Sequence, residues 1–97
     1  MPYRAPLDEY NFLFDHVVGL GKVRQTDRFE DASDDLTRAI LTEAGKLCEE
    51  VMAPLQRAGD MTPSYLENGV VRTADGYADG FKAIAEGGWI GMSADPA

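Results

Sequence analysis

The side chains best suited to catalysis are few in this sequence, which holds one histidine, His16, and one cysteine, Cys48. A nucleophile needs an adjacent base, and a metal site needs several suitably spaced ligands. His16 falls on the polar side of a predicted helix, which indicates a solvated surface histidine. Cys48 falls on an apolar side without a neighbouring cation, which indicates a structural cysteine. We therefore predict no catalytic residue and no metal site.

Carboxylates are plentiful, with 17 acidic residues against 9 basic ones and a net charge of −8. The densest acidic run lies between Asp27 and Asp35 and lacks the glycine and ligand spacing of a calcium loop, so a solvated charged stretch is predicted. The Gly19-Leu20-Gly21-Lys22 segment lacks the spacing of a phosphate-binding loop. The excess negative charge disfavours nucleic acid as a partner, because a phosphate backbone would be repelled.

Ser33 lies at the predicted start of a helix in a small acidic chain, which loosely resembles an acyl carrier protein with its modified serine. The residue after Ser33 is Asp34, where carrier proteins have an apolar residue. A serine that caps the helix N-terminus explains the position without any modification. We therefore keep the carrier protein as the less favoured alternative.

Three amphipathic helices are predicted to position these residues, from apolar side chains that recur at i, i+3 and i+4. They span approximately residues 7–20, 34–53 and 77–86. Pro54 lacks a backbone donor and is therefore predicted to kink or end the second helix near residue 53. The apolar spacing, which includes Leu55, leaves continuation of this helix past Pro54 as the alternative. Together they predict a small all-α domain.

Close packing and turns are indicated by a few further residues. Asn68-Gly69 between short apolar pairs predicts a tight hairpin at residues 65–72, and a loop with one turn is nearly as well supported. Gly45 lies at the edge of the second helix's apolar arc, where it either lets another backbone approach or is merely tolerated. On the third helix, one face carries Tyr77, Phe81, Ile84 and Ala85.

With 97 residues, the chain is predicted to form a single domain or a fragment of a larger protein, residues 1–97. Residues 1–33 would form an N-terminal helix and connector, and residues 34–97 the core. The sequence has neither an 18-residue apolar stretch nor the layout of a secretory signal, so no membrane span is expected. A single cysteine suits a reducing compartment, and we expect a cytoplasmic protein.

The sequence resembles the start of an acyl-CoA dehydrogenase. The extended N-terminus is similar to a subgroup that includes methylmercaptopropionyl-CoA dehydrogenase-like enzymes. The segments that carry the resemblance are Tyr3-Arg4-Ala5-Pro6-Leu7, Glu49-Glu50-Val51-Met52-Ala53-Pro54-Leu55, Gly59-Asp60, Gly76-Tyr77, Gly80-Phe81-Lys82-Ala83 and Glu86-Gly87-Gly88-Trp89-Ile90-Gly91-Met92-Ser93-Ala94-Asp95-Pro96.

The resemblance implies the N-terminal helical domain of a three-domain flavoprotein that oxidises the α,β carbon–carbon bond of an acyl-CoA thioester. In that family FAD binds between the later domains, a carboxylate in the C-terminal part removes the proton, and the enzymes are oligomeric. No flavin-binding or catalytic position of the family has a counterpart in these residues. The resemblance therefore implies a fragment that binds no cofactor itself and forms a wall of the acyl pocket.

Surplus apolar residues point to a packing surface against the remainder of the parent flavoprotein. The candidates for an interdomain or subunit interface are Phe12, Trp89, Ile90 and Met92, and for Trp89 ordinary core packing is equally well supported. The alternative function is a stand-alone acidic helical module that recruits a basic partner.

Overall fold

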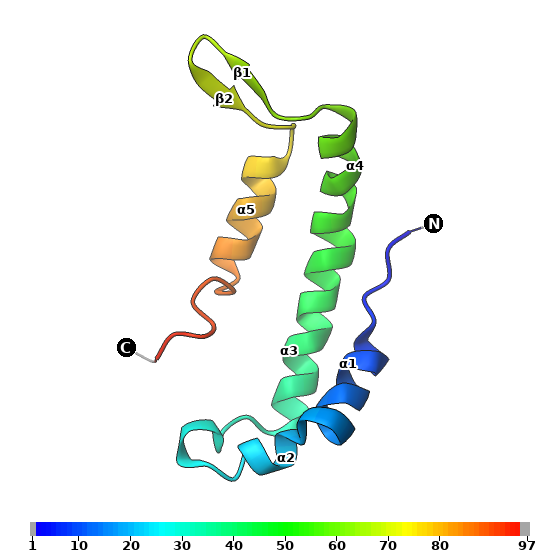
Figure 1. Cartoon of the computed structure of the whole chain (residues 1–97), viewed down its shortest axis with the longest axis vertical. Helices are drawn as coiled ribbons and strands as arrows, with labels where there is room; N and C mark the ends of the chain where they lie inside the picture. Colours follow the sequence, from blue (N-terminus) through cyan, green and yellow to red (C-terminus); the bar gives the residue numbers. More distant parts are fainter. Residues whose placement is uncertain (1, 96–97) are drawn as a thin grey trace. The chain divides into compact units, whose positions relative to one another are not determined.

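The computed structural model describes residues 2–95, which are mostly helical with one small hairpin (Figure 1). The contacts divide the chain into two units, one from Tyr3 to Lys46 and one from Leu47 onward. The division falls at the residue where α-helical geometry changes to π-helical geometry. Each unit is described by itself below.

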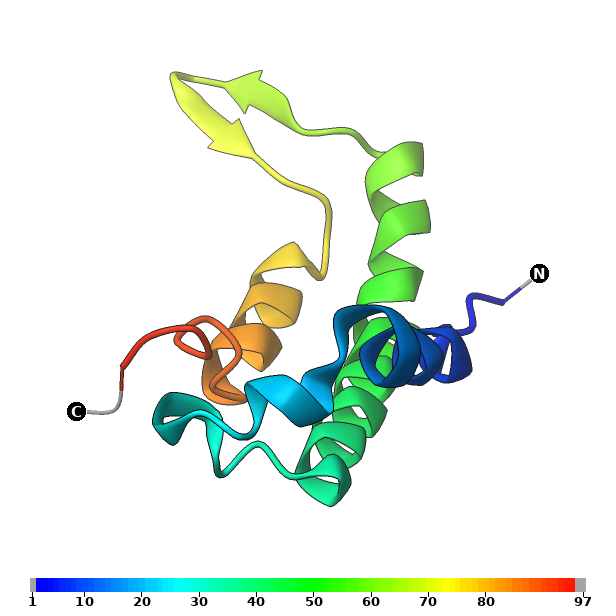
Figure 2. The same ribbon diagram turned by 60° about the horizontal axis from the view of Figure 1, so that its bottom comes forward.

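The first unit consists of short helical segments followed by one longer helix. The predicted helix at 7–20 is confirmed as far as Val18, and Gly19 ends it in a left-handed conformation with φ 71°. Such a conformation favours glycine because it has no Cβ. The elements, visible in two views (Figures 1 and 2), are α1 (Leu7–Leu13), the π-helical η1 (Phe14–Val18), α2 (Leu20–Val23), the 3-10 helix η2 (Asp27–Phe29) and α3 (Asp34–Lys46).

The start of α3 follows the predicted capping pattern. The backbone N–H of Leu36 donates to the Ser33 Oγ at 3.2 Å, which satisfies one of the free donors of the first turn. Farther along, Lys46 Nζ lies 2.9 Å from Glu43 Oε1 within one turn of the same helix. The capping role predicted for Ser33 is therefore confirmed.

The second unit contains a helix pair and the hairpin. Its elements are the π-helical η3 (Leu47–Met52), α4 (Ala53–Met61), β1 (Tyr65–Glu67), β2 (Val70–Arg72) and α5 (Tyr77–Glu86). The bounds of α5 match the prediction. Of the alternatives that the sequence left open at Pro54, continuation of the second helix past the proline is confirmed, and an end near residue 53 is wrong. Pro54 is the second residue of α4, where a missing N–H is tolerated. The preceding π-helical turn changes the hydrogen-bonding register just where the proline ring must be accommodated.

The hairpin at 65–72 is confirmed in its tighter form. Its strands are antiparallel, and Leu66 lies opposite Val71. Asn68 and Gly69 have φ of 50° and 80°, so both central residues of the turn are left-handed. This is the geometry that an Asn-Gly pair favours, because it matches the twist of the two strands.

Burial is slight throughout residues 2–95. The residues that are buried in this range are Gly45, Ala74 and Gly80, all of them small. Within the same range no large side chain is fully buried, and no helix is both long and apolar enough to cross a bilayer. Large apolar side chains that are exposed include Phe12, Val17, Val18, Met61, Leu66, Val71, Phe81, Ile90 and Met92. The described residues thus leave much apolar surface in contact with water.

Candidate functional site

An apolar groove lies in the second unit between the helix formed by η3 and α4 and the helix α5, green and yellow to orange in Figure 1. Its volume is about 380 Å³. The residues that line it from η3 and α4 are Met52, Leu55 and Gln56, and those that line it from α5 are Tyr77, Phe81 and Ile84. Tyr77, Phe81 and Ile84 lie on the apolar face that the sequence predicts for this helix.

Glycines allow the two helices of the groove to approach each other. A Cβ at Gly76 would lie 2.9 Å from Leu55 Cδ2, and a Cβ at Gly80 would overlap Leu55 Cδ1. The hydroxyl of Tyr77 occupies the place that a Cβ at Gly59 would need. Leu55 and Tyr77 therefore pack directly against glycines of the facing segment, where any larger residue would place a Cβ in their way.

The lining of the groove suits an apolar group better than a charged one. Gln56 supplies an amide and Tyr77 a hydroxyl, and the other lining side chains are hydrocarbon or thioether. A flavin would need positive charge or several converging donors for its pyrophosphate, and this lining has no charged side chain and only the Gln56 amide and the Tyr77 hydroxyl as donors. The groove therefore does not fit FAD, and no chemical step through the flavin follows from these residues.

His16 and Cys48 are the two side chains that the sequence analysis considered for catalysis. The His16 ring packs on the Phe12 ring, with centroids 4.9 Å apart and planes tilted by 51°. Cys48 is a half-buried free thiol in η3. Within residues 2–95, no group of three or more His, Cys, Asp or Glu side chains is placed to hold a metal ion. The prediction that neither residue is catalytic stays a prediction.

The predicted interface residues fall in both units. Phe12 in the first unit is 60% exposed, while Ile90 and Met92 in the second are 62% and 56% exposed. Trp89 is half-buried, and its indole folds against Gly87, where a Cβ would lie 2.6 Å from Nε1. The interface role of these four residues stays a prediction.

The groove itself was not predicted, although the apolar spacing from Met52 to Leu55 left continuation of the second helix past Pro54 open. A helix that continues past a proline in its first turn would have placed Leu55 and Gln56 opposite the third helix. The sequence gives no comparable sign that Gly59 receives Tyr77.

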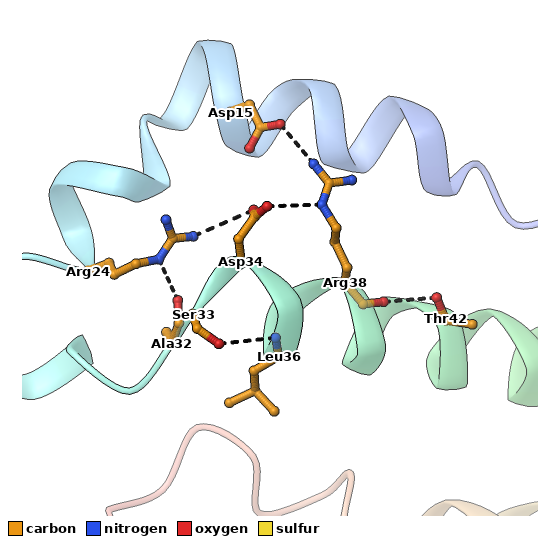
Figure 3. Close-up of polar contacts among 8 residues, drawn as sticks. All are labelled: Asp15, Arg24, Ala32, Ser33, Asp34, Leu36, Arg38 and Thr42. Atoms are coloured by element: carbon orange, nitrogen blue, oxygen red, sulfur yellow. Dashed lines mark hydrogen bonds and ion pairs between the residues drawn. The ribbon is translucent and has the colours of Figure 1, made fainter.

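A polar network joins three segments of the first unit (Figure 3). Arg38 Nε lies 3.2 Å from Asp34 Oδ2, and Arg38 Nη2 lies 3.1 Å from Asp15 Oδ2. Arg24 Nη2 lies 3.9 Å from Asp34 Oδ1, and Arg24 Nε donates to the carbonyl of Ala32 at 2.6 Å. The hydrogen bond that Arg38 donates to Asp34, together with the negative charge of Asp34, raises the pKa of Arg38 above its ordinary value. Arg38 therefore stays charged throughout the physiological range.

One of the three ion pairs in this network, that of Asp34 and Arg38, follows from i, i+4 spacing on one helix face. The partners Asp15 and Arg24 are distant in sequence, and neither carries a local signal for this contact. Their places depend on how the chain turns after Gly19.

Comparison with known proteins extends the picture beyond the fold. No family model matches the chain. The chain is 32% identical over 93 residues to 3-methylmercaptopropionyl-CoA dehydrogenase of Ruegeria pomeroyi, which covers 96% of this chain. The match spans 16% of that protein's length. It confirms the resemblance to acyl-CoA dehydrogenases that the sequence segments indicated.

Proposed function

We propose that this chain is the N-terminal helical domain of an acyl-CoA dehydrogenase. The parent enzyme oxidises the α,β carbon–carbon bond of an acyl-CoA thioester with FAD, and this part is not itself catalytic. The observation that carries the proposal is the match over 96% of the chain to a short part of 3-methylmercaptopropionyl-CoA dehydrogenase. A segment of that size fits a domain and not a complete flavoenzyme.

The exposed apolar residues support a packing role for this domain. Phe12, Ile90 and Met92 expose more than half of their surface, and no large side chain among residues 2–95 is fully buried. Ordering the chain costs conformational entropy that slight burial offsets poorly. Contact with the remainder of the flavoprotein, or with another subunit of a homo-oligomer, would supply the missing burial. Trp89 directly precedes Ile90 and is included among the packing residues of the second unit.

The groove supports a second part of the proposal, a wall of the acyl pocket. Met52, Leu55, Phe81 and Ile84 give it an apolar lining that suits an aliphatic chain. The flavin and the catalytic carboxylate belong to the remainder of the parent, because the groove offers neither a pyrophosphate site nor an acid–base pair. The domain therefore contributes shape and exclusion of water, and the rest of the enzyme contributes the chemistry.

A chimera tests this function directly. The segment of the Ruegeria pomeroyi enzyme that matches this chain is replaced by this chain, and flavin content and acyl-CoA-dependent dye reduction are measured. We expect the chimera to retain flavin and to oxidise acyl-CoA. Phe81→Asp in the chimera should raise KM or abolish activity, because a charge in the groove repels an apolar occupant. Lys46→Ala, which alters an exposed side chain outside the groove, is the matched control.

Two results would contradict the proposal. A chimera that fails to hold flavin, although the same enzyme with its own segment holds it, would show that this chain does not replace the domain. A fully active chimera in which Phe12→Asp, Trp89→Ala, Ile90→Asp and Met92→Asp together change neither flavin content nor subunit assembly would remove the packing role.

A further inference from the structure

The N-terminal arm, residues 5–18, is held against α3 by different contacts at its two ends. At its beginning the contact is apolar and close. Gly45 of α3 is buried, and a Cβ placed there would lie 3.3 Å from both Ala5 Cβ and Leu7 Cδ2. Because Gly45 has no side chain, Ala5 and Leu7 at the beginning of the arm pack closely against α3 at this position. The sequence left open whether Gly45 permits close approach of another segment or is merely tolerated, and the structure supports close approach.

The other end of the arm is held by charge. Arg38 Nη2 of α3 reaches Asp15 Oδ2 of η1 at 3.1 Å, while Nε of the same guanidinium holds Asp34. The side chains of Arg38 and Asp15 are 45% and 41% exposed, so water and ions reach the pair. Val17 and Val18, which end the arm, are largely exposed and add little apolar contact. Such a pair weakens when salt screens it.

We propose that the arm is a strap with a salt-sensitive latch. Its beginning at Ala5 and Leu7 stays seated on Gly45, while its end at residues 13–18 opens when the contact between Asp15 and Arg38 is screened or competed. Gly19 follows directly and adopts a left-handed conformation, which ends the helix and marks where the strap leaves the segment after it. This inference is independent of the proposed enzymatic function.

Hydrogen exchange of the full chain at about 20 mM and about 500 mM NaCl tests the latch, because exchange reports local opening. We expect protection of the amides at 13–18 to fall about two- to fivefold in high salt. Protection within α5 should stay unchanged. Asp15→Ala should reproduce the loss at low salt and remove the salt dependence, while leaving the pair of Asp34 and Arg38 intact.

Two further variants separate geometry from charge. Arg38→Lys keeps the positive charge, but an ammonium lacks the fork that serves two carboxylates at once, so we expect it to lose most of the protection at 13–18. Lys82→Ala is the matched control, because its ion pair with Glu86 joins residues of one helix in the second unit. It should leave residues 13–18 as they are.

The proposal is overturned by any of three results. Residues 13–18 could show no protection at low salt, which would mean that the strap is not docked. High salt could loosen α5 as much as the arm, which would show a general effect. Asp15→Ala could match Lys82→Ala at every amide of the arm, which would show that the ion pair holds nothing.

Discussion

Each of the two units of this chain is stabilised internally by a different kind of contact. In the first unit, side chains that bear charge connect segments distant in sequence, through Asp15, Arg24, Asp34 and Arg38. In the second unit, glycines remove side chains so that Leu55 and Tyr77 reach the facing helix. Charged contacts near water are weak and depend on salt, whereas close packing depends on shape. The units should therefore respond to different perturbations.

The largest effect is expected at Gly59 in the second unit. In Gly59→Ala the new Cβ overlaps the Tyr77 hydroxyl, and a rigid ring must move aside. We expect a loss of about 2 kcal/mol in the free energy of local opening of α5, roughly a thirtyfold loss of exchange protection. Adding Tyr77→Phe should restore part of it. Unchanged exchange in α5 would show that glycine packing does not hold this unit.

A smaller effect is expected in the hairpin. Gly69 has φ 80° with open space around it, so Gly69→Ala is opposed by backbone conformation and not by crowding. We expect a loss of about 1 kcal/mol, seen as faster exchange of the strand amides. Gly91→Ala is the control, because Gly91 also has open space and its φ is not left-handed. Equal effects of the two substitutions would contradict this explanation.

The charged network of the first unit should give a weaker effect that depends on salt. Arg38→Ala should reduce exchange protection at the start of α3 about two- to fivefold at low salt and negligibly at about 1 M NaCl. The pKa of Arg38 is raised, so its contribution is present at all pH below its ordinary pKa and is lost only as the pH rises through the raised value. Protection due to Arg38 should therefore be equal at about pH 6 and about pH 9. A persistent loss in high salt would point to packing instead of charge.

The smallest effect is expected at the glycine of the first unit. In Gly45→Ala, the neighbours Ala5 and Leu7 lie at 3.3 Å and must give way by a few tenths of an ångström. The gain in helix propensity, about 1 kcal/mol, opposes this strain. We expect a net change below about 0.5 kcal/mol in the free energy of unfolding of α3. A loss as large as that of Gly59→Ala would erase the contrast between the units.

Local patterns predicted the elements well and their contacts less well. The periodicity of residues 77–86, the Asn-Gly turn and the Ser33 cap each depend on neighbours within about four residues, and all three are confirmed. At Pro54 the sequence left two alternatives open, an end of the second helix and its continuation, and the structure shows continuation with the proline in the first turn of α4. The groove depends on this continuation and was not predicted.

The sequence by itself determined the three main helical segments and the place where the hairpin turns. These features follow from side-chain periodicity, backbone conformational preference and residue type, which act over a few positions. Only the tertiary structure decided that Arg38 pairs with Asp15. It also decided that Ala5 and Leu7 pack against Gly45, and that Tyr77 packs against Gly59. Such contacts join residues distant along the chain, and their identity depends on the path of the backbone between them.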